Sequence, residues 1–404
     1  IGVYEFSLVK LNKKIGLMAL AFLAVSPLAI AHSRMVYHTG PIPLLTVLSL
    51  WTLTRVLERR DWSAAWAMLS ITLLFQHELS LFPIFLALPL AWWWGGWQLG
   101  LKGNQLWKLS RRETAASCVA LMIGLLPQLV SEFQNHSGQL SGFGLWLIYR
   151  CLSFLNPSSN HFGLTSLSLA ITSLSQYASR VFITPQSGWI GIGVMGVLTG
   201  LTLWGWIKLL TKPKLLSPAA AITGLATGLI GLGYLVHGAP SEAYFPAAVV
   251  LLPLMIAIGW ATLDFKWRLV GSLNLILSLG LAVWGVWQSQ WFVDQTTTWN
   301  YGPSLKTQQT ALRWLNLTLK QPTFQVSSRD PGSEFDNYLA GYVWLGKGLN
   351  LEVNAKRNFI TQDRVQISQV ATQTHQMSFS DSARLTRFRP EYLDLPSLKL
   401  MIRP

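Results

Sequence analysis

The chain has 404 residues, of which 51% are hydrophobic and only 12% are charged. A soluble globular domain usually has about 25% charged residues, so this composition, with its long charge-free runs, places the chain in a lipid bilayer. The net charge of +14 comes from basic residues beside those runs and does not indicate nucleic-acid binding. The two cysteines, Cys118 and Cys151, cannot supply a disulfide framework.

Residues 1–9 read as the end of a helix without a cleavable signal peptide, so we expect further sequence upstream of Ile1. A helix that crosses a bilayer needs about 20 apolar residues. Nine runs meet or approach this length, at residues 15–32, 41–54, 62–76, 79–97, 114–130, 189–207, 216–236, 244–262 and 269–291. The sequence therefore predicts an all-α polytopic membrane domain of about nine spanning helices over residues 1–291.

Basic residues between the runs indicate the orientation. They gather at alternate joints, at Lys10, Lys13, Lys14, Arg55, Arg59, Arg60, Lys102, Lys108, Arg111, Arg112, Lys208, Lys212, Lys214, Lys266 and Arg268. The joints 33–40, 77–78, 131–188 and 237–243 hold only Arg34, Arg150 and Arg180. Because cytoplasmic joints carry the excess of lysine and arginine, these poorly basic joints and the tail after residue 292 are predicted to face outward from a plasma (inner) membrane.

Two regions outside the runs are expected to fold. In the outer loop 131–188, GFGLWLIYRCLSFL and LTSLSLAITSLSQYASRVF read as helices lying in the membrane interface, as the cap of a groove or as a structural plug. Residues 292–404 contain the strand-like segments TFQVSS, VQISQV and HQMSFS, with helices expected over 304–319 and 333–344. This pattern predicts a small extracytoplasmic α/β domain.

Small residues four apart occur in two of the runs, at Gly196 with Gly200 and at Gly224 with Gly228. Such pairs allow two membrane helices to approach closely, although glycine is also common in membrane helices without this role. Both pairs are therefore candidate positions for helix packing.

Arg34 and His38 lie four residues apart in the first outer joint. An arginine directly after a spanning helix commonly extends to lipid headgroups, which is a structural role. Arg34 instead stands on the side that this chain otherwise keeps free of basic residues, and a guanidinium there suits a lipid-linked phosphate because it donates two parallel hydrogen bonds. The two interpretations of Arg34 remain open, and His38 is a weaker candidate for the same role.

His77 and Glu78 end a run of only about fifteen residues, which as a helix covers roughly 22 Å, less than the roughly 30 Å of a hydrocarbon core. The pair is therefore predicted at or slightly below the outer interface, where ionisable groups are costly and usually functional. A polar turn between two helices is the alternative. The third outer joint holds His237, Glu242 and Tyr244, whose side chains either solvate that turn or face the same region as Arg34.

Motifs of soluble enzymes are absent from the sequence: it has no phosphate-binding glycine loop, no zinc-binding HExxH and no nucleophile elbow. The segment SPLAIAHSRMVYHTGPIPLLTVLSLWTLTRVLERRDW instead resembles the polyprenyl-phosphate-dependent membrane glycosyltransferases of the C fold. It is similar in style to the protein mannosyltransferases and to the aminoarabinose transferase that acts on lipid A. The later segments QHELSLFPIFLALPL and HGAPSEAYFPAAVVLLPLMIAIGW are similar to further joints of that family.

The resemblance implies a reaction and a division of roles. It implies transfer of a sugar from a polyprenyl-phosphate carrier to a lipid, glycan or protein acceptor on the outer face of the membrane, without nucleic acid and with no certain cofactor, although a divalent cation is compatible. His77–Glu78 stands where the family commonly has Thr-Lys, so the phosphate-binding role passes to His77 or is lost. Because residues 1–9 match the end of the family's second helix, the catalytic acidic residue is expected upstream of Ile1, and the chain to be a fragment.

A membrane transporter or lipid flippase is the alternative function. Such proteins favour internal repeats, interrupted helices and charges near the middle of the bilayer. This sequence has no evident repeat, and its candidate residues Arg34, His77 and His237 gather at one face. The pattern therefore favours chemistry at an interface. A structural membrane scaffold would not need these residues.

Overall fold

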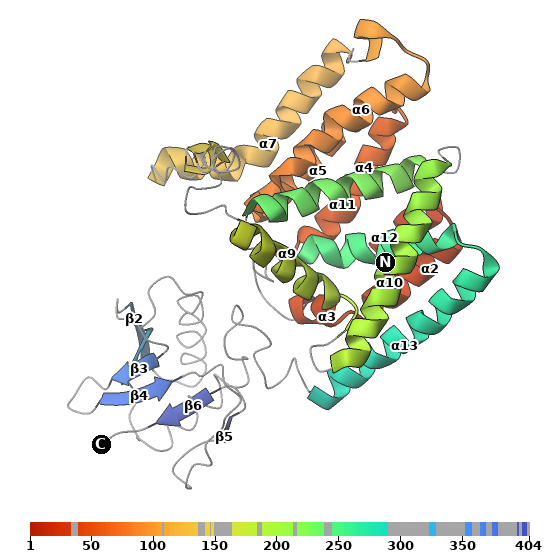
Figure 1. The fold of residues 1–404 in the computed structure, drawn as a ribbon. Coiled ribbons are helices and arrows are strands. Elements are labelled where there is room, and N and C mark those ends of the chain that lie inside the picture. The colour runs from red at the N-terminus through yellow and green to blue at the C-terminus, as the bar shows by residue number, and fades with distance from the viewer. Residues whose placement is uncertain are drawn as a thin grey trace. The chain divides into compact units, whose positions relative to one another are not determined.

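The computed structural model describes residues 1–33, 39–106, 109–135, 142–145, 147–148, 164–183, 188–212, 216–237 and 245–289, together with six strands farther along the chain. The chain divides into two compact units, Ile1–Trp284 and Gly285–Pro404. The first unit is helical, and the strands all belong to the second (Figure 1).

The helices of the first unit follow the predicted apolar runs closely. They are α1 Gly2–Lys10, α2 Lys13–Val25, α3 Pro27–Ser33, α4 Ile42–Leu57, α5 Ser63–His77, the 3-10 helix η1 Leu79–Leu86, α6 Ala87–Gln98, the 3-10 helix η2 Gly103–Leu106, α7 Arg111–Asn135, α9 Leu164–Ser179, α10 Gly188–Thr211, α11 Pro218–His237, α12 Pro246–Ala261 and α13 Phe265–Ser289. The expected interfacial helix around residue 170 is therefore present as a helix, α9.

Five stretches in the described part of the chain are long and apolar enough to cross a membrane. They are Leu79–Gln98, Arg111–Gln134, Trp189–Thr211, Pro218–Val236 and Phe265–Trp284. Two shorter apolar helices, α4 and α12, accompany them. The chain is thus a mostly helical protein compatible with a membrane, with fewer full-length spans than the nine runs predict.

Two of the predicted runs are interrupted. The run 15–32 breaks at Ser26, whose backbone is extended before Pro27 opens α3. Proline disfavours a helical conformation in the residue before it, which explains the break. The run 79–97 begins as η1, which contains Pro83, and becomes α-helical only at Ala87. Each interruption shortens an α-helix without ending the apolar run.

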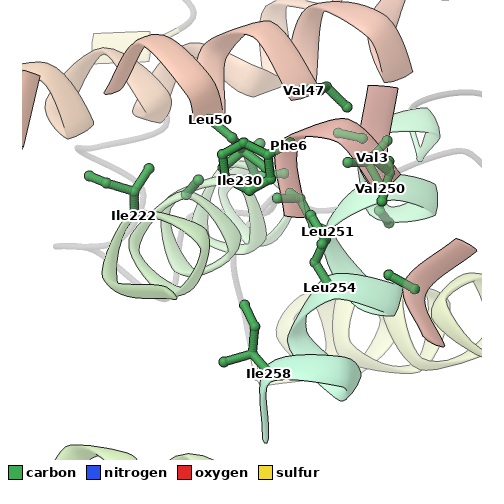
Figure 2. Packing of buried hydrophobic residues seen from close by; sticks show 14 of the residues in the cluster. Val3, Phe6, Val47, Leu50, Ile222, Ile230, Val250, Leu251, Leu254 and Ile258 are labelled. Carbon is green, nitrogen blue, oxygen red and sulfur yellow. The ribbon is translucent and has the colours of Figure 1, made fainter. Parts of the chain in front are cut away.

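Buried side chains from α1, α4, α11 and α12 form the centre of the helical unit. Figure 2 shows Phe6, Leu50, Ile230 and Leu251 gathered from these four helices. Almost all of α12 is buried, although it has only 16 residues. In a bilayer, close van der Waals packing of this kind holds helices together, because lipid tails are as apolar as the side chains.

Other helices keep a wide apolar face uncovered. Only 11% of the residues in the apolar part of the Arg111–Gln134 stretch of α7 are buried within the unit, and 22% of those in the Phe265–Trp284 stretch of α13. Their exposed residues include Met122 and Ile123 on α7 and Leu273 and Ile276 on α13. Exposed apolar surface of this extent is typical of helices that face lipid.

Of the two candidate glycine pairs, only Gly224 meets a described neighbour. A β-carbon at Gly196, Gly200 or Gly228 would have no described atom within 4 Å, whereas one at Gly224 would touch the Trp206 ring at 3.0 Å. The closest approaches of two backbones occur elsewhere. A β-carbon on Gly205 would lie 2.0 Å from the carbonyl oxygen of Gly259, and one on Gly95 would lie 2.2 Å from that of Leu57.

The second unit contains a six-stranded sheet. Its strands are β1 Thr323–Ser328, β2 Glu352–Arg357, β3 Arg364–Ser368, β4 Thr374–Ser378, β5 Asp394–Leu395 and β6 Leu398–Met401. Their order in the sheet is β2-β1-β3-β4-β6-β5; β1 and β2 are parallel, and the other neighbours are antiparallel. The predicted strand TFQVSS is β1, while the helices expected over 304–319 and 333–344 lie outside the described residues.

Candidate functional site

Ion pairs and ring contacts connect the basic joints. Lys10 bonds both carboxylate oxygens of Glu58, at 2.8 and 2.9 Å, which links the α1–α2 joint to the α4–α5 joint. The Arg59 guanidinium lies 3.7 Å over the Trp92 ring and so links the same joint to α6. We call the joints 10–14, 55–61, 99–112, 208–217 and 262–268 the lysine end of the unit.

The α10–α11 and α12–α13 joints belong to the lysine end as well. Lys208 donates a hydrogen bond to Asp264 at 2.7 Å. This hydrogen bond and the positive charge of Lys208 hold the pKa of the exposed Asp264 carboxyl below its usual value. The Thr262 hydroxyl also donates to the carbonyl oxygen of Gly205 at 2.9 Å. In Figure 1 the C-terminal ends of α10 and α12 lie on the same side of the view.

Described residues that flank the poorly basic joints contact one another away from the lysine end. The Leu28 amide at the start of α3 donates to the Arg180 carbonyl at 3.1 Å, in the turn after α9. Ser80, just after the α5–η1 joint, lies against Gly233 in the last turns of α11. We call the joint 77–78, the turn 180–183, the ends of α3 and α11 and the start of α12 the Glu78 end.

Glu78 is a buried carboxyl in the turn between α5 and η1. It is 7% exposed, and its Oε1 accepts a hydrogen bond from the Ser80 amide at 2.9 Å, which caps the first turn of η1. Burial raises the pKa of Glu78, and the Ser80 hydrogen bond opposes this effect without cancelling it. A carboxyl in such surroundings holds a proton more readily than one in water.

Glu78 is also recessed relative to the end of α7. The Gln76 amide donates to the carbonyl oxygen of Gly124 at 2.7 Å, and a β-carbon on Gly124 would lie 2.6 Å from Thr72, so the end of α5 lies level with the middle of α7. From Gly124, α7 continues to Asn135. At 1.5 Å per residue this extension is about 16 Å long.

A line of ring contacts runs from Glu78 to the other joints of this end. Tyr234 is 2% exposed, lies within electrostatic reach of Glu78 and stacks on Phe245, with ring centroids 4.4 Å apart and planes at 15°. Phe245 contacts Tyr177 at 5.3 Å, and the Arg180 guanidinium lies 5.4 Å from the Tyr177 ring. Since the Arg180 carbonyl accepts from Leu28, this line continues to α3, the helix that precedes Arg34.

The outer loop also contributes to this end. Phe143 contacts Phe75 of α5 at 5.3 Å and Phe82 of η1 at 5.9 Å, in edge-to-face or near edge-to-face geometry. Farther along, Val181, Phe182 and Ile183 are buried in the core of the unit. The loop is thus anchored by apolar side chains on both sides of its undescribed part.

The predicted site residues divide into described and undescribed ones. His77 ends α5 with its side chain partly exposed, and Glu78 is buried beside Tyr234. His237 ends α11, but its side chain lies outside the description. Arg34, His38, Glu242 and Tyr244 also lie outside the described residues. Of the predicted set, the structure therefore places the His77–Glu78 joint against the helix that ends at His237.

Sequence reasoning missed the aromatic residues of this end. Tyr234, Tyr177 and Arg180 are not among the predicted site residues. Tyr234 precedes His237 by three residues, so the helical period places it on the same face as that candidate. That spacing is the one signal that points to Tyr234; for Tyr177, only the tertiary contact with Phe245 does so.

Buried carboxyl, phenol and hydroxyl groups at this end suit a polar ligand presented from the membrane. Thr39 lies beside the undescribed segment 34–38, and its buried hydroxyl has no hydrogen-bond partner among the described residues. Within those residues, no group of three or more histidine, cysteine, aspartate or glutamate side chains could hold a metal ion. Comparison with family models, with curated proteins and with solved structures found no match to the chain.

Proposed function

We propose that this chain is a membrane glycosyltransferase that takes a sugar from a polyprenyl-phosphate carrier and passes it to a lipid, glycan or protein acceptor. One observation supports the proposal: the His77–Glu78 joint packs against the last turns of α11. Ser80 lies against Gly233, and Tyr234 contacts Phe245, so the His77–Glu78 joint, the end of α11 and the residue after Tyr244 belong to one region. A single lipid phosphate bound there would reach groups from all three segments.

The proposed topology has about nine crossings and a Glu78 end that faces outward from the plasma membrane. The short helices α4, α5 and α12 and the interrupted α2–α3 pair are the additional crossings, packed among the longer helices. The lysine end then faces the cytoplasm, as the excess of lysine and arginine requires. The C-terminal residues 292–404 form an extracytoplasmic α/β domain in this arrangement.

The proposed chemistry divides between donor and acceptor. Arg34, with His38, His77 and His237, holds the donor phosphate, while Glu242 and Tyr244 line the same region. The acceptor oxygen or nitrogen attacks the anomeric carbon, the bond from that carbon to the phosphate oxygen breaks, and the lipid phosphate leaves with the electron pair. A carboxylate takes the acceptor proton, and the fixed cations stabilise the departing phosphate. The residues assigned here concern the donor phosphate only.

Direct donor binding tests the proposal. The wild-type chain in lipid nanodiscs is titrated with a radiolabelled polyprenyl-phosphate sugar, beside Arg34→Gln and the matched control Arg60→Gln. Arg60 is an exposed arginine at the lysine end. We expect saturable binding that Arg34→Gln weakens about tenfold or more, because a charge-assisted phosphate contact contributes about 1.5–3 kcal/mol. Arg60→Gln should bind like the wild type.

Two outcomes would contradict the proposal. Absence of saturable donor binding to the wild-type chain would show that the polyprenyl-phosphate sugar is not the substrate. Equal weakening of binding by both arginine variants would show that Arg34 does not form the phosphate site. An assay of lipid movement in proteoliposomes distinguishes the alternative function from the proposed one, because a transporter or flippase would move the labelled lipid from one leaflet to the other. Such movement, abolished by Arg34→Gln, would favour that alternative.

A further inference from the structure

Glu78 stands out among the groups of this end because it is an acid placed where an anionic ligand is expected. Its carboxyl is buried in the turn between α5 and η1 and accepts the Ser80 amide hydrogen bond. An ionised carboxylate in a poorly solvated place repels a nearby phosphate far more strongly than it would in water. The charge on Glu78 therefore decides whether a phosphate is tolerated beside it.

The helices around Glu78 bring few charges to it. Among the described elements, η1 packs against α5, α6 and α11. Neither η1 nor α6 has a titratable side chain; α5 contributes His77, and α11 contributes Tyr234 and, at its end, His237. Of these groups, Tyr234 lies within electrostatic reach of Glu78, and as a phenol it carries no positive charge near neutral pH. The surroundings described thus favour the neutral carboxyl, in line with the raised pKa of Glu78.

We propose that donor binding at the Glu78 end is linked to a proton on Glu78, so that the neutral carboxyl admits the donor phosphate and the carboxylate excludes it. This inference rests on the proposed function, since it takes the polyprenyl-phosphate donor as the ligand. The neutral carboxyl has an O–H group that donates to a phosphate oxygen, whereas the carboxylate has only acceptors. Glu78 is then a proton-dependent binding residue.

The direction of the pH dependence follows from this linkage. Donor affinity is highest where Glu78 is protonated and falls as the pH rises through its pKa. Burial raises that pKa, so the fall lies above the range of an ordinary glutamate, about 4.3. A bound phosphate disfavours the carboxylate further, and binding at a pH near the pKa therefore takes up protons from the buffer.

The test uses the polyprenyl-phosphate sugar itself as the probe, because its phosphodiester keeps one negative charge across the range studied. Its dissociation constant is measured in nanodiscs from about pH 5 to about pH 9. This range lies above the ordinary pKa of glutamate and includes that of histidine. We expect the wild type to lose about tenfold or more in affinity across this range. Glu78→Gln, which mimics the neutral carboxyl, should keep its low-pH affinity to the highest pH.

Two further variants separate Glu78 from other titrating groups. The matched control Glu113→Gln removes a carboxyl at the lysine end, beside Ser110, and should keep the wild-type pH profile. His77→Gln removes the neighbouring histidine, which the proposed function places on the donor phosphate. We expect it to weaken binding while leaving the Glu78-dependent fall in place.

Calorimetry of the unmutated chain gives a second readout that does not depend on a variant's folding. Donor binding in two buffers of different ionisation enthalpy should show proton uptake. If wild-type binding takes up no protons, or if Glu78→Gln keeps the wild-type pH dependence, the linkage is wrong while the proposed function stands. If the wild type binds no donor at any pH, the proposed function fails and the linkage fails with it.

Discussion

Gly233 of α11 lies so close to Ser80 of η1 that a β-carbon on Gly233 would stand 2.0 Å from the Ser80 carbonyl oxygen. This backbone contact places α11 against the turn that contains Glu78. Tyr234, the next residue, lies within electrostatic reach of the buried Glu78 carboxyl. The geometry of the Glu78 end therefore depends on the absence of a side chain at Gly233.

Replacing Gly233 by alanine should separate the two segments. The added methyl group meets backbone and the ring of Pro83, neither of which moves easily, so we expect Gly233→Ala to destabilise the chain by about 1–3 kcal/mol. Thermal unfolding in nanodiscs measures the loss. Gly228→Ala on the same helix is the control, because no described atom lies within 4 Å of its β-carbon. Equal effects of the two variants would contradict this role of Gly233.

The buried Glu78 should make stability depend on pH. Its pKa is raised in the folded protein, so the folded state holds the proton more tightly than the unfolded state. The resulting stability is fully present below the unfolded pKa of about 4.3 and is lost as the pH rises through the folded pKa. We expect the melting temperature of the ligand-free chain to fall over this window. In Glu78→Gln this fall should be absent; an unchanged profile would show that Glu78 does not titrate there.

The Lys10–Glu58 ion pair should couple the first helices measurably. Its side chains are only 16% and 25% exposed, and Lys10 contacts both carboxylate oxygens. A double-mutant cycle of Lys10→Gln and Glu58→Gln should give a coupling energy of about 1 kcal/mol, at the upper end for pairs near a surface. The Lys208–Asp264 pair is the comparison. Since the Asp264 side chain is 74% exposed, its coupling should be smaller and should vanish first as salt is added.

The two ends of the helical unit should be reached from opposite sides of the membrane. In a background with Cys118 and Cys151 replaced by alanine, single cysteines are placed at the exposed positions Ser33 and Ser110. A membrane-impermeant maleimide should label Ser33→Cys in intact cells and Ser110→Cys only after permeabilisation. Labelling of both from the same side would overturn the proposed topology.

The helices could be predicted from the sequence because a bilayer forces each backbone to satisfy its own hydrogen bonds. An apolar run in lipid has to be helical; the run 41–54 coincides with α4 except for its first residue, Pro41, and the run 189–207 lies within α10. The interruption at Pro27 and the 3-10 geometry of η1 were missed. Both arise from local backbone conformation, to which hydropathy is insensitive.

The packing and the site were only partly predictable. Gly196 and Gly200 carry the expected small-residue spacing but meet no described partner, while the unpredicted Gly233 makes the decisive contact. Spacing shows that a helix has a smooth face, but the partner of that face is fixed by the positions of other helices. The same reason hid Tyr234 and Tyr177, whose significance comes from their ring contacts with Phe245.

The sequence by itself determined that the chain is mostly helical and compatible with a membrane, with basic residues gathered at alternate joints, and it drew attention to His77 and Glu78 as ionisable groups between two apolar runs. These properties follow from composition and from the position of charges along the chain. Only the tertiary structure decided that Glu78 is buried and lies within electrostatic reach of Tyr234. Burial and a raised pKa require neighbours from α11 and η1, and the close approach of Gly233 to Ser80 brings those neighbours together.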